Sequence, residues 1–90
     1  GMALGSSDHL VEGNTIEGGR IGISITGGEA QLRDNVVEGS SGRGIAIGGV
    51  SRPVLSGNRS CGNGDNLWVA DSAMPELDET NEICKDDATE

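Results

Sequence analysis

The sequence predicts an all-β fold in which short parallel strands wind into a solenoid, one coil upon the next. Three observations predict this fold. Asparagine recurs at intervals of 21, 23 and 23 residues, at Asn14, Asn35, Asn58 and Asn81. Apolar residues alternate with polar ones in pieces of three to five residues, which is the periodicity of strands. Glycine accounts for 16 of the 90 residues, and it separates the pieces where the chain must turn sharply.

Three strands follow one another in the same order in each coil. The first strand precedes each asparagine, with an apolar residue three positions before it at Val11, Leu32 and Leu55 and four positions before it at Leu77. The second strand follows the asparagine and turns Ile16, Val37, Ser60 and Ile83 inward. The third strand repeats every 22 residues and turns two residues inward in each coil: Ile23 and Ile25, Ile45 and Ile47, Leu67 and Val69. Because equivalent strands stack about 4.8 Å apart, we expect three full coils of about 22 residues and a partial fourth.

The chain divides into three segments. Residues 1–9 form a lead-in whose first two residues, Gly1 and Met2, are interpreted as the remnant of a tag before a start methionine. Residues 10–85 form the repeat domain, and residues 86–90 form an acidic tail. The net charge is −9, which argues against a nucleic-acid partner. No apolar run approaches the roughly 18 residues that cross a bilayer, so membrane insertion is not expected.

The repeat resembles a known family. The Asn-x-Ile phase at 14–16 and the Gly-Ile-x-Ile phase at 44–47 resemble the repeat of the right-handed parallel β-helix proteins of the pectate-lyase-like superfamily, over about residues 10–85. The resemblance implies a right-handed single-stranded parallel β-helix. It implies little about activity, because lyases, hydrolases, epimerases and non-catalytic surface proteins share the fold. It favours an extracellular or periplasmic location, but the chain shows no signal peptide and the compartment stays unknown.

The four asparagines are expected to form a ladder along one corner of the solenoid. An asparagine tolerates left-handed backbone and offers both a donor and an acceptor, so that it can satisfy a buried turn. We interpret the ladder formed by Asn14, Asn35, Asn58 and Asn81 as structural rather than ligand-binding.

Cys61 and Cys84 fall in one column, 23 residues apart. Equivalent Cα atoms on adjacent coils lie close enough for a disulfide, but parallel strands do not aim the two Cβ atoms well at one another. The pair is therefore either a disulfide or two stacked thiols. Because these are the only thiols and His9 lies far off in the sequence, we do not expect a metal site with four converging ligands.

Glu17 stacks above Glu38 in the same column, and like charges on neighbouring strands repel. Arg20 and Arg43 at the following turns could neutralise this pair, and a bound Ca²⁺ ion is the alternative because hard cations favour carboxylate oxygens. The stretch 62–67 is similar to one copy of a Gly-Asp calcium-binding nonapeptide, but no second copy follows. The sequence therefore predicts no cofactor, with Ca²⁺ as the alternative.

Trp68 is the only aromatic residue, and it occupies an outward position of the third strand together with Ser24 and Ala46. This column offers no acid, base or metal ligand, so that no catalytic residue is predicted. The indole either forms a saccharide platform by stacking on a sugar ring, or is covered by residues 70–74 or by a neighbouring subunit.

The ends of a solenoid expose unpaired backbone and apolar interior, so we expect a homo-oligomer that forms through the end coils. The preferred hypothesis is a non-catalytic structural or interaction module built from β-helix repeats, either self-associating or part of a larger surface or carbohydrate-related assembly. The alternative is a polysaccharide-binding or polysaccharide-processing unit, similar to a lyase or epimerase, whose active site is incomplete.

Overall fold

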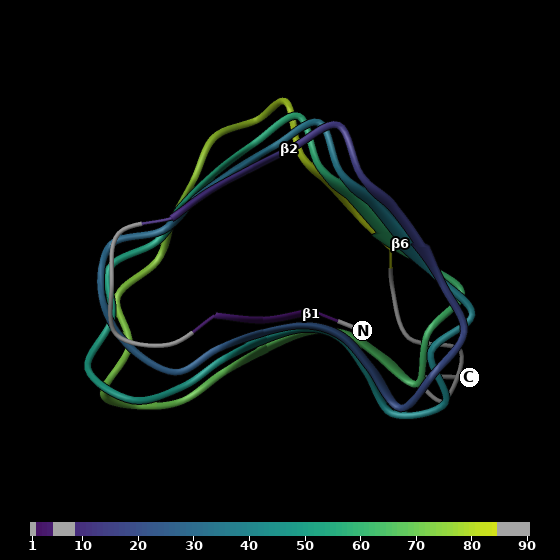
Figure 1. The fold of residues 1–90 in the computed structure, drawn as a ribbon, viewed down its shortest axis with the longest axis horizontal. Helices are drawn as coiled ribbons and strands as arrows, with labels where there is room; N and C mark the ends of the chain where they lie inside the picture. Colours follow the sequence, from purple (N-terminus) through teal and green to yellow (C-terminus); the bar gives the residue numbers. More distant parts are fainter. Residues whose placement is uncertain (1, 5–8, 85–90) are drawn as a thin grey trace.

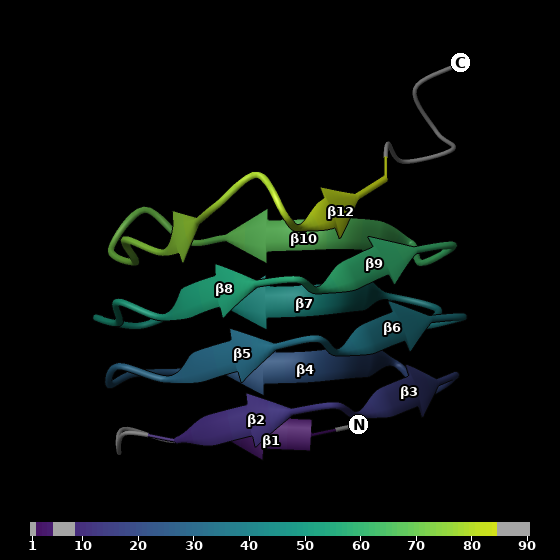
Figure 2. The same cartoon turned by 90° about the horizontal axis from the view of Figure 1, so that it is seen from above.

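The computed structural model describes residues 2–4 and 9–84, and these residues form a parallel β-solenoid of about three turns. Seen along the solenoid, the backbone traces a three-sided outline in which successive coils superimpose (Figure 1). Seen from the side, the coils lie one above another (Figure 2). The predicted all-β β-helix is confirmed. The acidic tail at 86–90 and most of the predicted lead-in lie outside the described residues.

Each side of the solenoid is a four-stranded parallel sheet with one strand from each coil. Sheet A contains, in spatial order, β1 (Met2–Leu4), β4 (Ile21–Ile25), β7 (Arg43–Ile47) and β10 (Asp65–Val69). Sheet B contains β2 (Leu10–Glu12), β5 (Gln31–Arg33), β8 (Val54–Ser56) and β11 (Glu76–Leu77). Sheet C contains β3 (Thr15–Glu17), β6 (Val36–Glu38), β9 (Arg59–Cys61) and β12 (Glu82–Ile83).

The register places residues with equivalent sequence positions side by side. In sheet A, Ile23 pairs with Ile45, and Ile45 pairs with Leu67. In sheet C, Val37 pairs with Ser60. Sheet A also contains β1, which lies within the predicted lead-in and pairs in parallel with β4. The columns of the solenoid therefore follow directly from the spacing of the repeats.

The core is a stack of aliphatic side chains enclosed by the three sheets. The aliphatic residues that are completely shielded from solvent are Ile23, Ile25, Leu32, Val37, Ile45, Ile47 and Leu55. Ile16 and Leu67 pack against this stack while remaining partly exposed. Val69 differs from the expectation of an interior residue, because 38% of it is exposed. It lies in β10, at the edge of sheet A, where no further described strand covers it.

No helix occurs in the described parts of the chain, so none there has the length and apolarity needed to cross a bilayer.

Candidate functional site

The four asparagines of the repeat lie along one corner, each bonded to the next. The side-chain amide of Asn14 donates to Oδ1 of Asn35 at 3.1 Å, and that of Asn35 donates to Oδ1 of Asn58 at 2.9 Å. Asn58 donates in turn to Oδ1 of Asn81 at 3.0 Å. Each acceptor oxygen also receives the backbone N–H of the preceding asparagine. The structure thus brings these four residues together in one continuous chain of hydrogen bonds.

The asparagine amides also bond to backbone carbonyls one coil away. Asn35 donates to the carbonyl of Val11 at 3.0 Å, and Asn58 donates to that of Leu32 at 2.8 Å. Both asparagine side chains are buried, with at most 1% of the residue exposed. Among the described residues, every buried side-chain nitrogen and oxygen atom has a hydrogen-bond partner. The ladder therefore uses its polar atoms to join coils, and buried amides of this kind are stabilising because they are satisfied.

A second buried polar network, most of which the repeat pattern does not predict, lies beside sheet C. Oδ1 of Asn63 accepts the backbone N–H of Ser40 at 2.8 Å, while its amide donates to the Ser60 hydroxyl at 3.1 Å. Ser60 donates to the carbonyl of Asn66 at 2.6 Å. The signal in the sequence was Ser60, a hydroxyl in an otherwise aliphatic column. The two asparagines belong to the stretch 62–67 that suggested a calcium-binding repeat, and Oδ1 of each accepts hydrogen bonds from the protein itself.

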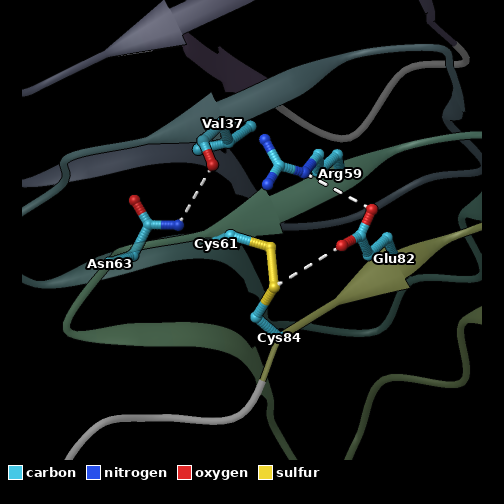
Figure 3. A network of polar contacts seen from close by, with 6 residues as sticks. All are labelled: Val37, Arg59, Cys61, Asn63, Glu82 and Cys84. Atoms are coloured by element: carbon cyan, nitrogen blue, oxygen red, sulfur yellow. Dashed lines mark hydrogen bonds and ion pairs between the residues drawn. A yellow bond between two sulfur atoms is a disulfide. The ribbon is translucent and has the colours of Figure 1, made fainter.

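Cys61 and Cys84 form a disulfide between the last two coils (Figure 3). Cys61 is the last residue of β9, and Cys84 directly follows β12 in the next coil. Their Cα atoms are 5.0 Å apart. Of the two states that the sequence leaves open, the structure contains the oxidised one. A crosslink at this place fastens the last described coil to the coil before it.

Glu82 and Arg59 lie next to this disulfide on the outer face of sheet C (Figure 3). The Nε atom of Arg59 is 3.4 Å from Oε1 of Glu82, and both side chains are at least half exposed. The other carboxylate oxygen, Oε2, is 3.9 Å from Sγ of Cys84. The two sulfur atoms and a Glu82 oxygen all lie within 4.8 Å of one another. An exposed ion pair stabilises a fold little, so its main effect here is to orient the carboxylate.

The same face carries an open hollow of about 560 Å³. Its charged lining residues are Glu17, Glu38 and Arg59, and Cys61 borders it as well. Glu17 and Glu38 are direct partners in the register of β3 and β6. The hollow thus places two stacked carboxylates beside a guanidinium group and the disulfide.

Trp68 contacts Arg43, which the sequence places at a turn near the stacked glutamates. The guanidinium of Arg43 lies over the indole ring, 4.1 Å from its centroid, rather than serving only as a counter-charge for the glutamates. Trp68 itself is half-buried. A cation at this distance is attracted by the ring electrons, and it covers one face of the ring. Arg43 therefore occupies one face of the indole ring, and its positive charge lies next to any ligand that contacts the rest of the ring.

Asp78 is an exposed carboxylate in the turn between β11 and β12, and its pKa is lowered from the ordinary value of 3.8. The largest cause is the hydrogen bond from the Thr80 hydroxyl, followed by that from the Thr80 backbone N–H and then that from Ser56. Hydrogen bonds donated to a carboxylate favour its charged form. This carboxylate holds the turn that leads into Asn81.

The comparisons with known proteins support the same architecture. The family described as "Right handed beta helix region" matches residues 1–85. No curated protein and no solved structure gives a significant match to the chain. The match covers the described strands of all three sheets, and it concerns the repeat rather than any one activity.

Proposed function

The chain belongs to the right-handed β-helix family, and from this premise we propose that it is a non-catalytic structural or interaction module that self-associates through the last coil of its solenoid. The partner is a second copy of the same chain. The parallel β-helix places strand edges of three sheets together at each end of the stack, and such edges are templates for pairing with another chain.

The observation that carries the proposal is the state of the last described coil. β10, β11 and β12 are the outermost strands of the three sheets, and within the described residues no strand pairs with their outer edges. Large apolar side chains are exposed in the same coil, with exposed fractions of 38% at Val69, 65% at Met74 and 39% at Leu77. Backbone pairing and apolar burial would therefore act together when two such ends meet.

The interior polar groups support a structural role. The buried polar residues are asparagines and serines, namely Asn35, Ser40, Ser51, Asn58, Ser60, Asn63 and Asn66. Those in the two networks bond to neighbouring coils or to the turn, so their donors and acceptors hold the solenoid together. Side chains used in this way are not available to a substrate.

Light scattering across a concentration series tests self-association. We expect the mass to rise toward twice the 9.2 kDa of one chain. Met74→Lys combined with Leu77→Lys places two charges on the last coil and should leave a monomer, because lysine on a strand edge disfavours pairing. Val50→Lys is the matched control, since Val50 is 83% exposed and precedes β8 in the chain, one coil earlier. A mass of 9.2 kDa at every concentration would overturn the proposal.

A second candidate function is the binding of an acidic polysaccharide, and the contact between Arg43 and Trp68 favours it. The half-buried indole offers an apolar surface to the ring of a uronate sugar. The guanidinium group beside it offers a counter-charge to the carboxylate of that sugar. Trp68 is the only aromatic residue, so its fluorescence reports binding directly. A saturable shift with a polyuronate, absent with a neutral glucan and weakened by Arg43→Gln, would support this function. An unchanged spectrum would eliminate it.

A further inference from the structure

We propose that reduction of the Cys61–Cys84 disulfide creates a binding site for one Zn²⁺ ion, with the two thiolates and the Glu82 carboxylate as its ligands. The proposal is independent of self-association, because it concerns the outer face of sheet C rather than the strand edges. It gives the Glu82 carboxylate the role of a metal ligand. The spacing of Glu82 and Cys84, two residues apart at the end of a strand, was the available signal.

The positions of the three groups carry the proposal. The two Sγ atoms and a Glu82 oxygen lie within 4.8 Å of one another, and Oε2 of Glu82 is 3.9 Å from Sγ of Cys84. In a tetrahedral zinc site, Zn–S bonds of about 2.3 Å and Zn–O bonds of about 2.1 Å put ligand atoms roughly 3.5–3.8 Å apart. Side-chain rotation between Cα atoms 5.0 Å apart lets the sulfurs separate to that distance. The backbone can therefore stay in place.

The fold explains why these groups converge. The register of sheet C pairs Glu38 with Cys61 and places Cys84 in the coil beyond. Residues two apart on a strand point to the same face, so Glu82 and Cys84 emerge together next to Cys61. Figure 3 shows the Glu82 carboxylate directed at the sulfurs. Two coils thus supply three ligand atoms without any loop rearrangement.

Arg59 completes the arrangement as a positioning residue. Its Nε atom contacts Oε1 of Glu82 at 3.4 Å, which leaves Oε2 on the side of Cys84. Carboxylates that bind metals are commonly held by such outer contacts. Two thiolates, one carboxylate and Zn²⁺ carry a net charge of −1, because three negative ligands meet a doubly charged cation, and the guanidinium offsets that charge. Glu38 in the adjacent coil adds further attraction for a cation.

The ligand chemistry selects the class of metal. Thiolates favour zinc and other soft or borderline cations over Ca²⁺ and Mg²⁺, which prefer oxygen ligands. Zinc sites with three protein ligands keep a fourth position for water. Glu82 is 63% exposed in its side chain, so solvent reaches this position. The oxidised chain offers only the carboxylate, and binding is therefore controlled by the redox state of the pair.

The chemical step balances with a phosphine as the reductant. The phosphine attacks the S–S bond, one water molecule supplies its oxygen to form the phosphine oxide, and the two protons of that water end on the two sulfur atoms. Zn²⁺ then replaces both thiol protons, because the thiolate is the ligand. Exchange with an added small-molecule disulfide, which is itself reduced to two thiols, would re-form the Cys61–Cys84 bond and release the ion.

The test is calorimetry with Zn²⁺ alone on the full chain, in the reduced and oxidised states. Titration with Cd²⁺ adds the ultraviolet charge-transfer band of metal-bound thiolates. We expect one Zn²⁺ per reduced chain, at least tenfold tighter than in the oxidised chain, with the release of protons. Glu82→Gln should weaken binding of the reduced chain at least about tenfold, while the charge-transfer band persists at saturation. Glu79→Gln removes the same charge from an exposed residue of the same coil and should leave affinity unchanged.

Equal affinity in the reduced and oxidised chains would overturn the proposal, as would a Glu82→Gln variant that binds like the parent chain. Far-UV circular dichroism accompanies each titration, because reduction can loosen the last coil. If the reduced chain loses its β spectrum, recovery on adding Zn²⁺ supports the site. Failure to recover in the presence of Zn²⁺ counts against it.

Discussion

Replacing Asn58 by alanine should destabilise the solenoid far more than the same change at Asn14, although both residues belong to the same ladder. Asn58 is buried, and its side chain accepts hydrogen bonds from the backbone and the amide of Asn35. It also donates to the carbonyl of Leu32 and to Oδ1 of Asn81. Asn14 is half-buried at the first ladder position. The two substitutions therefore compare a buried ladder position, Asn58, with a partly solvated one, Asn14.

The structure sets the size of the expected difference. Without the Asn58 side chain, the buried backbone N–H of Asn35 loses its acceptor and the Leu32 carbonyl loses a donor. Each buried polar group left without a partner costs about 1–3 kcal/mol, so we expect a loss of about 2–6 kcal/mol. In the Asn14→Ala variant, Oδ1 of Asn35 still accepts a hydrogen bond from the backbone N–H of residue 14. The expected loss there is about 0.5–1.5 kcal/mol, the net value of an ordinary hydrogen bond.

Urea denaturation of the oxidised chain measures both variants. Trp68 is the only aromatic residue, so its fluorescence and far-UV circular dichroism provide two independent probes of unfolding. A domain of 90 residues has a total stability of roughly 5–13 kcal/mol. The Asn58→Ala variant should therefore approach the limit of folding, while Asn14→Ala stays close to the parent chain. Equal losses for the two variants, or a loss below about 1 kcal/mol at Asn58, would refute the reasoning.

Three further predictions concern other parts of the chain. Reduction of the disulfide in metal-free buffer should lower the free energy of unfolding by about 3 kcal/mol, as expected for a crosslink across 23 residues, and unchanged urea midpoints would contradict this. Gly44→Ala should lower the free energy of unfolding by about 1–3 kcal/mol, because the added methyl group would collide with the buried Ser60 hydroxyl. Gly48→Ala is the control: its methyl group would lie at an ordinary 3.6 Å from its nearest neighbour, so this variant should melt like the parent chain. Because the pKa of Asp78 is lowered in the folded state, its stabilising contribution is present above the unfolded pKa of 3.8 and is lost as the pH falls through the folded pKa. Thr80→Val should bring the Asp78 pKa back toward 3.8 in an NMR titration, and an unchanged pKa would exclude the Thr80 hydroxyl as its cause.

Much of the fold follows from the spacing of a few residues. The intervals of 21, 23 and 23 residues between the asparagines predict the coil length, and the alternation around Ile23 and Ile45 predicts which side chains enter the core. In a parallel solenoid the position along the repeat determines the column, because each strand pairs with its equivalent one coil away. Two apolar residues of the third strand depart from the pattern. Val69, expected in the interior, is exposed where the described sheet has no further strand, and Ala46, expected on the outer face, is only 5% exposed.

The side-chain chemistry on the outer faces could be predicted only in part. The column of Cys61 and Cys84 was visible in the sequence, but the spacing alone left a disulfide and two thiols equally compatible with it, and the structure contains the disulfide. Glu82 joined the sulfurs because β12 places it on their side. Arg43 lies three positions before Ala46, the strand neighbour of Trp68, and its long side chain spans that distance to reach the indole. Because none of these contacts repeats from coil to coil, the periodicity of the sequence could not predict them.

The sequence by itself determined the coil length, the columns and the asparagine ladder, because in-register pairing turns a one-dimensional repeat into a three-dimensional stack. Three features are seen only in the tertiary structure. They are the hydrogen bond between Ser40 and Asn63, the disulfide of the cysteine pair and the position of Arg43 over Trp68. The physical reason is the range of the forces involved. Backbone pairing transmits periodicity along the whole solenoid, whereas hydrogen bonds, disulfides and ring contacts depend on a few ångströms at a single turn.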